Sequence, residues 1–172
     1  FTAAVANKGY FFTPHILKNI DKRPIENPSF TDKKQTTIDK KHFSPVIDAM
    51  YEVFKTGSGK WSQVKGIEIC GKTGTSENYT VVNGKRIKLE DHSILVAFAP
   101  KDNPKIAIAI FVENGGYGSR IAAPITSLMI EKYLNGSISE ATVHRETNML
   151  NISLQEEYNK LIPKIETIAA RR

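Results

Sequence analysis

The residues from Lys72 to Thr75 combine a cation, two hydroxyls and a glycine, which are groups that can bind or activate an acyl or phosphoryl substrate. Together with the residues before them, they fit the phosphate-loop pattern G-x-x-x-x-G-K-[ST] over Gly66 to Thr73. A phosphate loop needs small residues before the lysine and a helix directly after it. Here Ile-Glu-Ile-Cys precedes the second glycine, and Gly74 to Asn78 is a poor helix start. The context therefore argues against nucleotide binding.

The same residues fit an extended strand at the edge of a sheet. A strand-like peptide can pair with such an edge by β-augmentation, and Gly74 would let its backbone approach closely. Lys72 supplies a positive charge, and Thr73 and Thr75 supply hydroxyls, all of which suit a carboxylate. The string therefore predicts an edge strand that binds an extended peptide with a carboxylate group.

The elements before this string are predicted from helical spacing and breakers. Phe1 to Asn7 is predicted to be a helix, and Tyr10 to Ile20 an extended or edge segment. Residues 21 to 34 are predicted to form a surface loop that returns as a hairpin strand at 35 to 38. Phe43 to Lys55 is predicted to be a helix with Ser44 and Pro45 at its start. Its apolar face is predicted to comprise Val46, Met50, Val53 and Phe54.

The elements after the string predict an α+β layer arrangement. Asn83 and Gly84 form a hairpin signal between 79–82 and 86–89. Two apolar strands, 92–99 and 105–112, follow around a short proline-rich turn. A glycine loop at 114–118, a helix at 119–134 and a helical stretch at 153–169 complete the chain. The last carries an apolar stripe, and Pro163 is predicted to interrupt it.

The Lys-Thr-Gly triplet belongs to the motifs of penicillin-binding proteins and class A β-lactamases. Beyond the triplet, the segments 71–78, 91–100, 102–116 and 122–125 follow in order and spacing. This succession resembles the end of the elongation-type penicillin-binding protein 2 family over residues 1 to 134. Asp91-His92 and Glu113 to Gly116 favour that family over its septal relative.

The resemblance implies a fold and a site. The fold would be a partial β-lactamase/transpeptidase-like fold, with three contiguous antiparallel strands packed with N-terminal and C-terminal helices. Residues 1–136 would be the C-terminal portion of the transpeptidase domain and 137–172 a helical tail. Lys72, Thr73 and Thr75 would contact the substrate carboxylate, with Gly74 between them. The catalytic contributions would come from Lys72 and from the backbone amide of Thr75 in the oxyanion hole.

The resemblance also implies an activity and a location. The full-length protein would be a D,D-transpeptidase that crosslinks peptidoglycan stem peptides through a serine acyl-enzyme, without a metal or other cofactor, and that β-lactams acylate. It would lie at the periplasmic face of the bacterial inner membrane, anchored by an N-terminal segment outside this sequence.

The family nucleophile belongs to a Ser-x-x-Lys motif, which we expect this sequence to lack, since Ser29, Ser44 and Ser58 have no lysine three residues later. Ser76-Glu77-Asn78 fits the family's Ser-x-Asn letters but falls in the predicted substrate strand. The sequence also begins within a predicted helix. We therefore expect a segment of a larger enzyme, inactive alone, whose nucleophile lies elsewhere. A non-catalytic interaction module that kept the fold is the alternative.

Composition excludes several classes of function. The net charge is +6, but the basic residues are spread out and not interleaved with aromatics, so no nucleic-acid platform is predicted. The apolar run from Ile106 to Val112 is too short to span a bilayer. The histidines lack metal-ligand spacing, and Cys70 is predicted to be a buried structural thiol.

Truncation would leave strand 105–112 without one neighbour, because the strand matching it is central in the five-stranded sheet that the resemblance implies. An unpaired apolar edge invites another chain. The sequence therefore predicts self-association through residues 105–112, or coverage of that edge by Tyr10 to Ile20 or by the tail.

Overall fold

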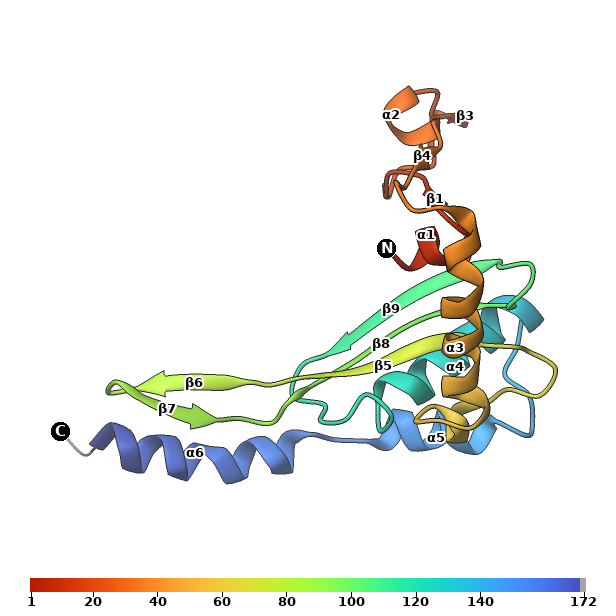
Figure 1. The fold of residues 1–172 in the computed structure, drawn as a ribbon. Helices are drawn as coiled ribbons and strands as arrows, with labels where there is room; N and C mark the ends of the chain where they lie inside the picture. The colour runs from red at the N-terminus through yellow and green to blue at the C-terminus, as the bar shows by residue number, and fades with distance from the viewer. Residues whose placement is uncertain (171–172) are drawn as a thin grey trace.

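A three-stranded antiparallel sheet forms the centre of the computed structural model, which describes residues 1–170 (Figure 1). Its strands are β5 (Cys70–Ser76), β8 (His92–Ala99) and β9 (Ile106–Val112), in the order β5-β8-β9. The predicted strand 92–99 has these same bounds, and the strand predicted at 105–112 begins one residue later. The sheet and the helices around it give the predicted α+β fold.

Helices cover both faces of the sheet. Leu95, Ala97 and Ala99 pack on one face against residues of α4 (Ala122–Asn135). On the other face, Phe98 clusters with apolar residues of α1 (Thr2–Ala6) and α3 (Phe43–Lys55). Phe98 and the three residues on the α4 face have no exposed surface. Burial of apolar area from two directions fixes the position of β8, and through its hydrogen bonds that of β5.

Helix α3 has the predicted bounds but a different buried face. The residue before it is His42, so Ser44 lies inside the helix and is not its N-cap. The buried positions are Phe43, Ile47, Met50 and Phe54, whereas the predicted Val46 is 48% exposed. Spacings of four, three and four residues follow one stripe of a helix. The prediction placed that stripe one residue too early at Val46.

The N-terminal region contains short hairpins. β1 (Tyr10–Phe11) pairs with β4 (Lys34–Gln35), which confirms a returning strand, although it returns one residue earlier than predicted. β2 (Asn19–Ile20) pairs with β3 (Arg23–Pro24). The predicted loop also contains the short helix α2 (Pro28–Thr31), which begins after Asn27, whose side chain accepts a bond from the Ser29 amide. The turn η1 (Lys40–His42) leads into α3.

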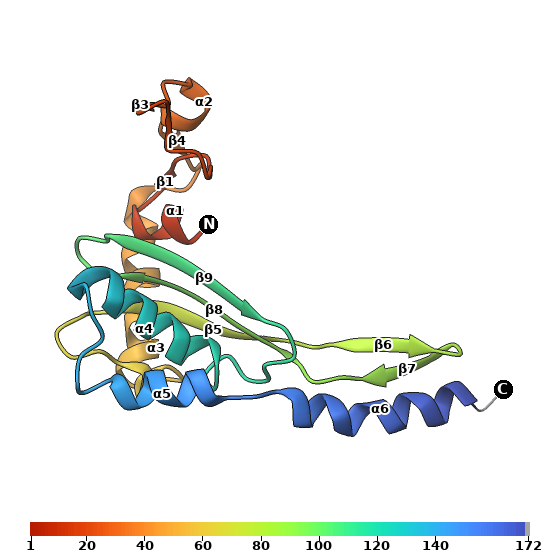
Figure 2. The same ribbon diagram turned by 180° about the vertical axis from the view of Figure 1, so that it is seen from behind.

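A second unit, which we call the arm, projects from the end of the sheet (Figures 1 and 2). It consists of β6 (Tyr79–Val82), β7 (Lys85–Lys88) and α6 (Gln155–Ala170), which lies along the hairpin. Asn83 and Gly84 have φ of 49° and 73°, the left-handed values of the predicted tight turn. The side-chain amide of Asn83 donates to the Ala169 carbonyl at 3.0 Å. Contrary to the prediction, α6 continues through Pro163.

Helix α5 (Val143–Asn151) was not predicted; none of its residues is buried, and polar contacts hold it in place. Arg145 donates to Ser127 Oγ at 2.9 Å and to the carbonyls of Trp61 and Gln63 at 3.1 and 3.0 Å. Nearby, the buried Glu131 carboxylate of α4 accepts hydrogen bonds from Ser139 and Thr142. These bonds join the tail to α4 and to the turn η2 (Lys60–Ser62).

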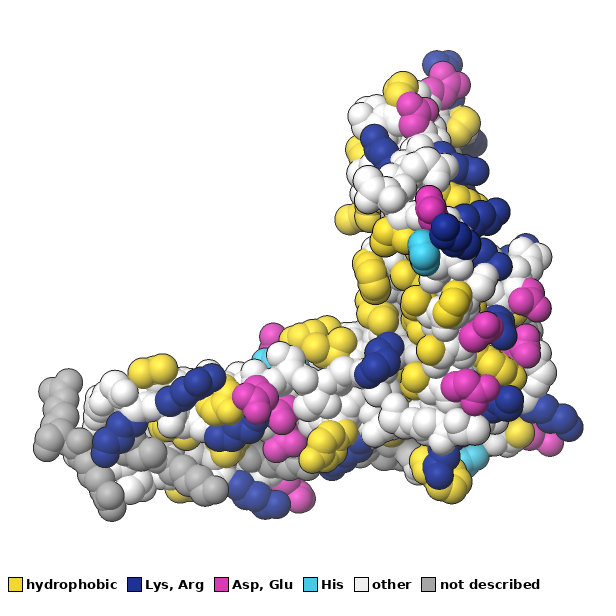
Figure 3. Space-filling view, in the orientation of Figure 1, with side chains coloured by type: hydrophobic (Ala, Val, Ile, Leu, Met, Phe, Trp, Pro, Cys, Tyr) yellow, Lys and Arg dark blue, Asp and Glu magenta, His cyan; other side chains and the backbone are white. Residues whose placement is uncertain are grey.

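The outer edge of β9 pairs with no strand among residues 1–170. Tyr10–Phe11 and Asn19–Ile20 pair elsewhere, and α6 lies along the hairpin β6–β7. The prediction that one of these segments covers this edge was therefore wrong. No helix in the described part of the chain is both long and apolar enough for a membrane span. Figure 3 shows basic and acidic side chains interspersed over the face that it draws.

Candidate active site

Strand β5 is an edge strand, as predicted for the string Lys72 to Thr75. It pairs with β8 on one side, with Lys72 opposite Val96 and Thr75 opposite Ser93. No strand of the described residues pairs with its other side. An edge of this kind can accept an extended peptide by backbone hydrogen bonding.

The pleat sends the side chains of Lys72 and Thr73 to opposite faces of β5. Cys70, two residues before Lys72, lies in the cluster with Phe98, whereas Thr73 is opposite Leu95. Lys72 and Thr75 are exposed and Thr73 is half-buried. A ligand that contacts both Lys72 and Thr73 must therefore lie along the free edge of the strand.

Two hydrogen bonds hold the polar groups of this string. The Lys72 ammonium donates to the Thr73 carbonyl at 2.7 Å. The Thr73 hydroxyl lies 2.7 Å from the hydroxyl of Ser58, which belongs to the glycine turn after α3. The sequence considered alone assigned Ser58 no contact with Thr73, so this contact was missed. A serine between Gly57 and Gly59 is a weak signal, because such turns are common at helix ends.

The glycine loop after β9 supports the backbone of β5 from behind. A Cβ atom on Gly118 would lie 2.6 Å from the Gly74 carbonyl oxygen and closer still to that of Ile94. The buried Ser93 hydroxyl donates to the Tyr117 carbonyl at 3.0 Å and accepts from the Ala122 amide at 3.2 Å. The loop therefore touches the strand where Thr75 begins, a role that the sequence analysis did not assign to Gly118.

Polar contacts close the junction of the sheet and the arm. The Asp91 carboxylate binds the Lys88 ammonium and accepts from the Asn78 amide at 3.3 Å. The bond to Lys88 is the main reason that the pKa of Asp91 is lowered from its ordinary value. His92 Nδ1 accepts from the Asn114 amide at 3.1 Å. Asp91 and His92 thus anchor the start of β8.

Cys70 is buried as predicted, with no exposed surface. Burial raises the pKa of its thiol from 9.0 to about 12, because the thiolate would lose its hydration. The thiol therefore stays protonated at neutral pH and is a poor nucleophile.

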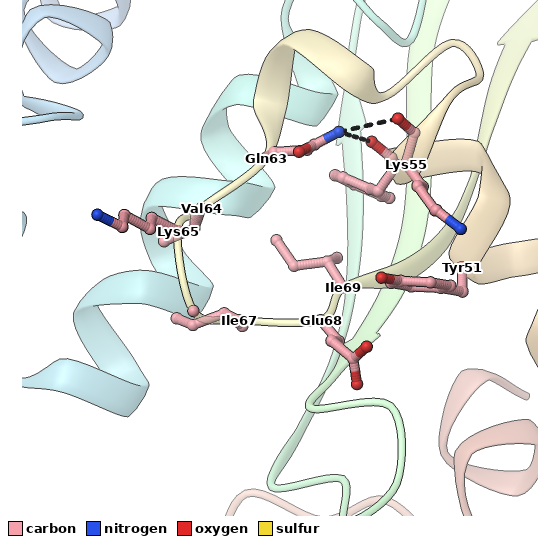
Figure 4. Close-up of a pocket in the computed structure, with 10 residues that line it drawn as sticks. Tyr51, Lys55, Gln63, Val64, Lys65, Ile67, Glu68 and Ile69 are labelled. Carbon is pink, nitrogen blue, oxygen red and sulfur yellow. Dashed lines mark hydrogen bonds between the residues drawn. The ribbon is translucent and has the colours of Figure 1, made fainter.

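A pocket of about 300 Å³ lies beside the segment that leads into β5 (Figure 4). Its lining includes Tyr51, Lys55, Gln63 and Ile69 but none of the residues 72–75. Gln63 donates to the carbonyls of Phe54 and Lys55 at 2.7 and 3.0 Å and so caps the end of α3. The pocket is thus a feature of the α3–β5 connection.

The structure rejects the phosphate-loop reading. Val64 and Ile67 form an isolated bridge, and Cys70–Ser76 is a strand where a phosphate loop requires a helix. Ser76 lies within that strand, as expected for the coincidental Ser-x-Asn string. The chain offers no turn of amides around a phosphate at this place.

One serine corrects the expectation that Ser-x-x-Lys is absent: Lys65 follows Ser62 by three residues. In the active motif, a helix places the lysine beside the serine. Here Ser62 ends the turn η2, Gln63 is extended with φ −61° and ψ 149°, and Lys65 is exposed. Ser62 itself is 2% exposed. Ser62 and Lys65 do not share a helix, so this string matches the Ser-x-x-Lys sequence but not its structure.

Comparisons with known proteins agree with this geometry. The family model described as the penicillin binding protein transpeptidase domain matches residues 1–131. The peptidoglycan D,D-transpeptidase MrdA of Acinetobacter baumannii is 30% identical over 142 residues, which is 72% of this chain and 20% of the relative. The peptidoglycan D,D-transpeptidase PbpA of Mycobacterium tuberculosis is 32% identical over 143 residues, covering 78% of this chain and 28% of the relative.

Solved structures show the same likeness. The crystal structure of Pseudomonas aeruginosa PBP2 in complex with WCK 5153 has a TM-score of 0.61 at 31% identity, covering 81% of this chain and 30% of that one. The imipenem acyl-enzyme complex of penicillin-binding protein A from M. tuberculosis has a TM-score of 0.60 at 30% identity, covering 77% and 29%. The chain thus spans less than a third of these proteins. Because the family model covers most of its length and its edge strand holds Lys72 to Thr75, the chain belongs to the penicillin-binding protein transpeptidase domain family.

Proposed function

We propose that this chain supplies the substrate strand and half of the oxyanion hole of a peptidoglycan D,D-transpeptidase. The free edge of β5 at Lys72 to Thr75 is the observation that carries the proposal. The stem peptide, or a β-lactam in its place, lies along this edge. The relatives named as D,D-transpeptidases and the solved acyl-enzyme complexes support this choice of substrate.

Each group of the string has a role in this proposal. The hydroxyls of Thr73 and Thr75 donate to the terminal carboxylate of the substrate, and the Lys72 ammonium supplies positive charge to the cleft. A serine outside this sequence attacks the carbonyl, and the Thr75 amide donates to the oxyanion that forms. The peptide bond to the terminal D-alanine breaks as the acyl-enzyme ester forms, and D-alanine leaves with the proton of the serine. An amine of a second stem peptide then displaces the serine oxygen, which regains a proton. These steps use no metal or other cofactor.

The proposal includes a location. Peptidoglycan is assembled outside the bacterial inner membrane, so the complete enzyme works at the periplasmic face of that membrane, with a role in cell-wall growth and cell shape. The names of the relatives support this location through their substrate.

The experiment uses the complete protein that contains this segment and a fluorescent penicillin. We expect Lys72→Met and Thr73→Val to slow covalent labelling by roughly tenfold or more, because each removes a charge or a donor from the carboxylate. Lys65→Met is the matched control, since it removes an exposed lysine from the Ser62-x-x-Lys65 string. It should label at the unchanged rate.

The 172-residue chain alone should show no label. Labelling of this chain would contradict the proposal that the nucleophilic serine lies outside this sequence. A complete reading frame without a helical Ser-x-x-Lys would instead favour the non-catalytic module that kept the fold.

We propose in addition that the isolated chain self-associates through the open edge of β9. Ile108 and Ile110 are half-buried, and the backbone groups on that edge lack a strand partner among residues 1–170. Sedimentation velocity at rising concentration should show dimers or larger species. Lysines at the exposed Ala107 and Ala109 should reduce the association. A monomer at every concentration would contradict the proposal.

A further inference from the structure

The contact between Ser58 and Thr73 joins two parts of the chain that are 15 residues apart. Their hydroxyl oxygens are 2.7 Å apart, and either can be the donor. Ser58 is exposed and Thr73 is half-buried, so the pair lies at the surface of β5 and not in its core. A hydrogen bond between surface hydroxyls contributes little to stability, because water can replace either partner.

The turn that carries Ser58 is firmly held. The amides of Gly57 and Gly59 donate to the Glu52 and Val53 carbonyls of α3 at 3.0 and 2.9 Å. A Cβ atom on Gly59 would lie 3.2 Å from the ring of Phe54, which is 2% exposed. Serine adds a single side-chain torsion to this base, so its oxygen reaches Thr73 at little entropic cost.

Phe54 also connects the turn with β5. Its ring would lie 2.7 Å from a Cβ atom on Gly71, one residue before Lys72. The same aromatic ring therefore packs under both the Ser58 turn and the start of the Lys72 string. This arrangement fixes the distance between the Ser58 and Thr73 hydroxyls through packed atoms rather than through a flexible loop.

A hydroxyl has one proton to donate and two lone pairs that accept. When an anionic carboxylate accepts a hydrogen bond from the Thr73 hydroxyl, the Thr73 oxygen can only accept a hydrogen bond from Ser58. Ser58 then becomes the donor, and the chain of bonds runs from Ser58 through Thr73 to the carboxylate. Each bond in such a chain polarises the next and strengthens it.

We propose that Ser58 is a positioning residue that orients the Thr73 hydroxyl as a donor toward the substrate carboxylate. This inference rests on the proposed function of Thr73. Ser58 does not touch the substrate in this arrangement and acts through Thr73 alone. Its effect is therefore confined to ligands that carry the carboxylate and to proteins that retain the Thr73 hydroxyl.

The test measures the second-order rate constant of acylation in the complete protein by a fluorescent penicillin and by the methyl ester of its carboxyl group. Ser58→Ala should slow acylation by the free acid by roughly three- to tenfold, the value of one hydrogen bond. Ser58→Thr keeps the hydroxyl and should return the rate to within about twofold. Ser29→Ala, at an exposed position of α2, is the control and should leave the rate unchanged.

A double-mutant cycle separates the inference from a general structural role. In the Thr73→Val background, Ser58→Ala should cause no further loss, and with the ester its effect should shrink. The inference would be overturned if Ser58→Ala lowered the acylation rate equally in both backgrounds. It would also be overturned if Ser58→Ala acylated at the unchanged rate while Thr73→Val acylated slowly. Either outcome would leave the proposed function intact. A normal rate for Thr73→Val would overturn the assigned role of Thr73 and the inference with it.

Discussion

The sheet strands and the hairpin β6–β7 of the arm follow one another in the chain, yet they are stabilised differently. β8 has helices on both faces, and Leu95, Ala97 and Phe98 have no exposed surface. The hairpin β6–β7 has α6 on one side, and Ile87 is its single buried position. Val81 near the tip is 68% exposed.

The sheet holds chemical groups at fixed positions, whereas the arm extends away from the sheet. An edge strand that must present an amide and hydroxyls at fixed points needs a close-packed support behind it. An arm that extends away from the sheet needs only enough contacts to keep its shape. The candidate site therefore lies on the part of the chain where a small displacement costs most, and the following predictions measure that difference.

The largest contrast is expected for core truncation. Phe98→Ala should lower the free energy of unfolding by about 3–5 kcal/mol, because it empties a fully buried position between β8 and α3. Val81→Ala in the arm should change it by less than about 0.5 kcal/mol. Urea unfolding of both variants checks this, and equal losses would mean that the arm is part of the core.

Two glycines give the next comparison. Gly118→Ala should cost about 3 kcal/mol, because the new methyl meets backbone oxygens that cannot move without shifting β5. Gly84→Ala should cost about 1 kcal/mol, since its site has open space and only its φ of 73° is unfavourable. Thermal unfolding ranks the two, and the reverse order would show that the Gly118 loop can retreat from β5.

Removal of α6 should have a smaller and local effect. A chain that ends at Asn151 loses the hydrogen bonds that the side-chain amides of Asn83 and Asn114 donate to the Ala169 carbonyl and the Tyr158 hydroxyl. Amide hydrogen exchange should become faster in β6 and β7, whereas β8 should keep its protection, with a loss of overall stability below about 1 kcal/mol. Faster exchange throughout β8 would contradict the independence of the two regions.

At neutral pH the smallest effect is expected for Cys70, because its thiol loses its proton only in alkaline solution. Its pKa is about 12 in the folded chain against 9.0 for an ordinary thiol, so the folded state holds the proton more tightly. Stability from this group is present below pH 9 and falls as the pH rises from about 9 towards 12. Cys70→Ala should lack this part of the decline. Parallel pH profiles of the two proteins would contradict the burial of the thiol.

The sequence identified strands well where their apolar pattern was uniform. The strand at His92 to Ala99 and the turn at Asn83-Gly84 were predicted because burial and turn chemistry act locally. α5 was missed because Arg145 bonds to groups more than 80 residues away, at Trp61 and Gln63. α6 continues through Pro163, against the local rule for a proline inside a helix.

The candidate site divides in the same way. Lys72 to Thr75 could be identified from their residue types, and the structure places them on the predicted edge strand. Ser58 and Gly118 could not be identified in this way, because their importance comes from the atoms that tertiary folding brings beside them. Ser62-x-x-Lys65 shows the converse, since the letters of a motif occur without the helix that would make them function.

The direct passage from β5 into β6 has a consequence for the length of the arm. Adding the same number of residues to both strands beside Asn83 and Gly84 would lengthen the arm while Lys72 stays opposite Val96. The length of the hairpin is therefore independent of the register that places Lys72 to Thr75. The hairpin tip is also the natural place to insert a reporter domain into the chain.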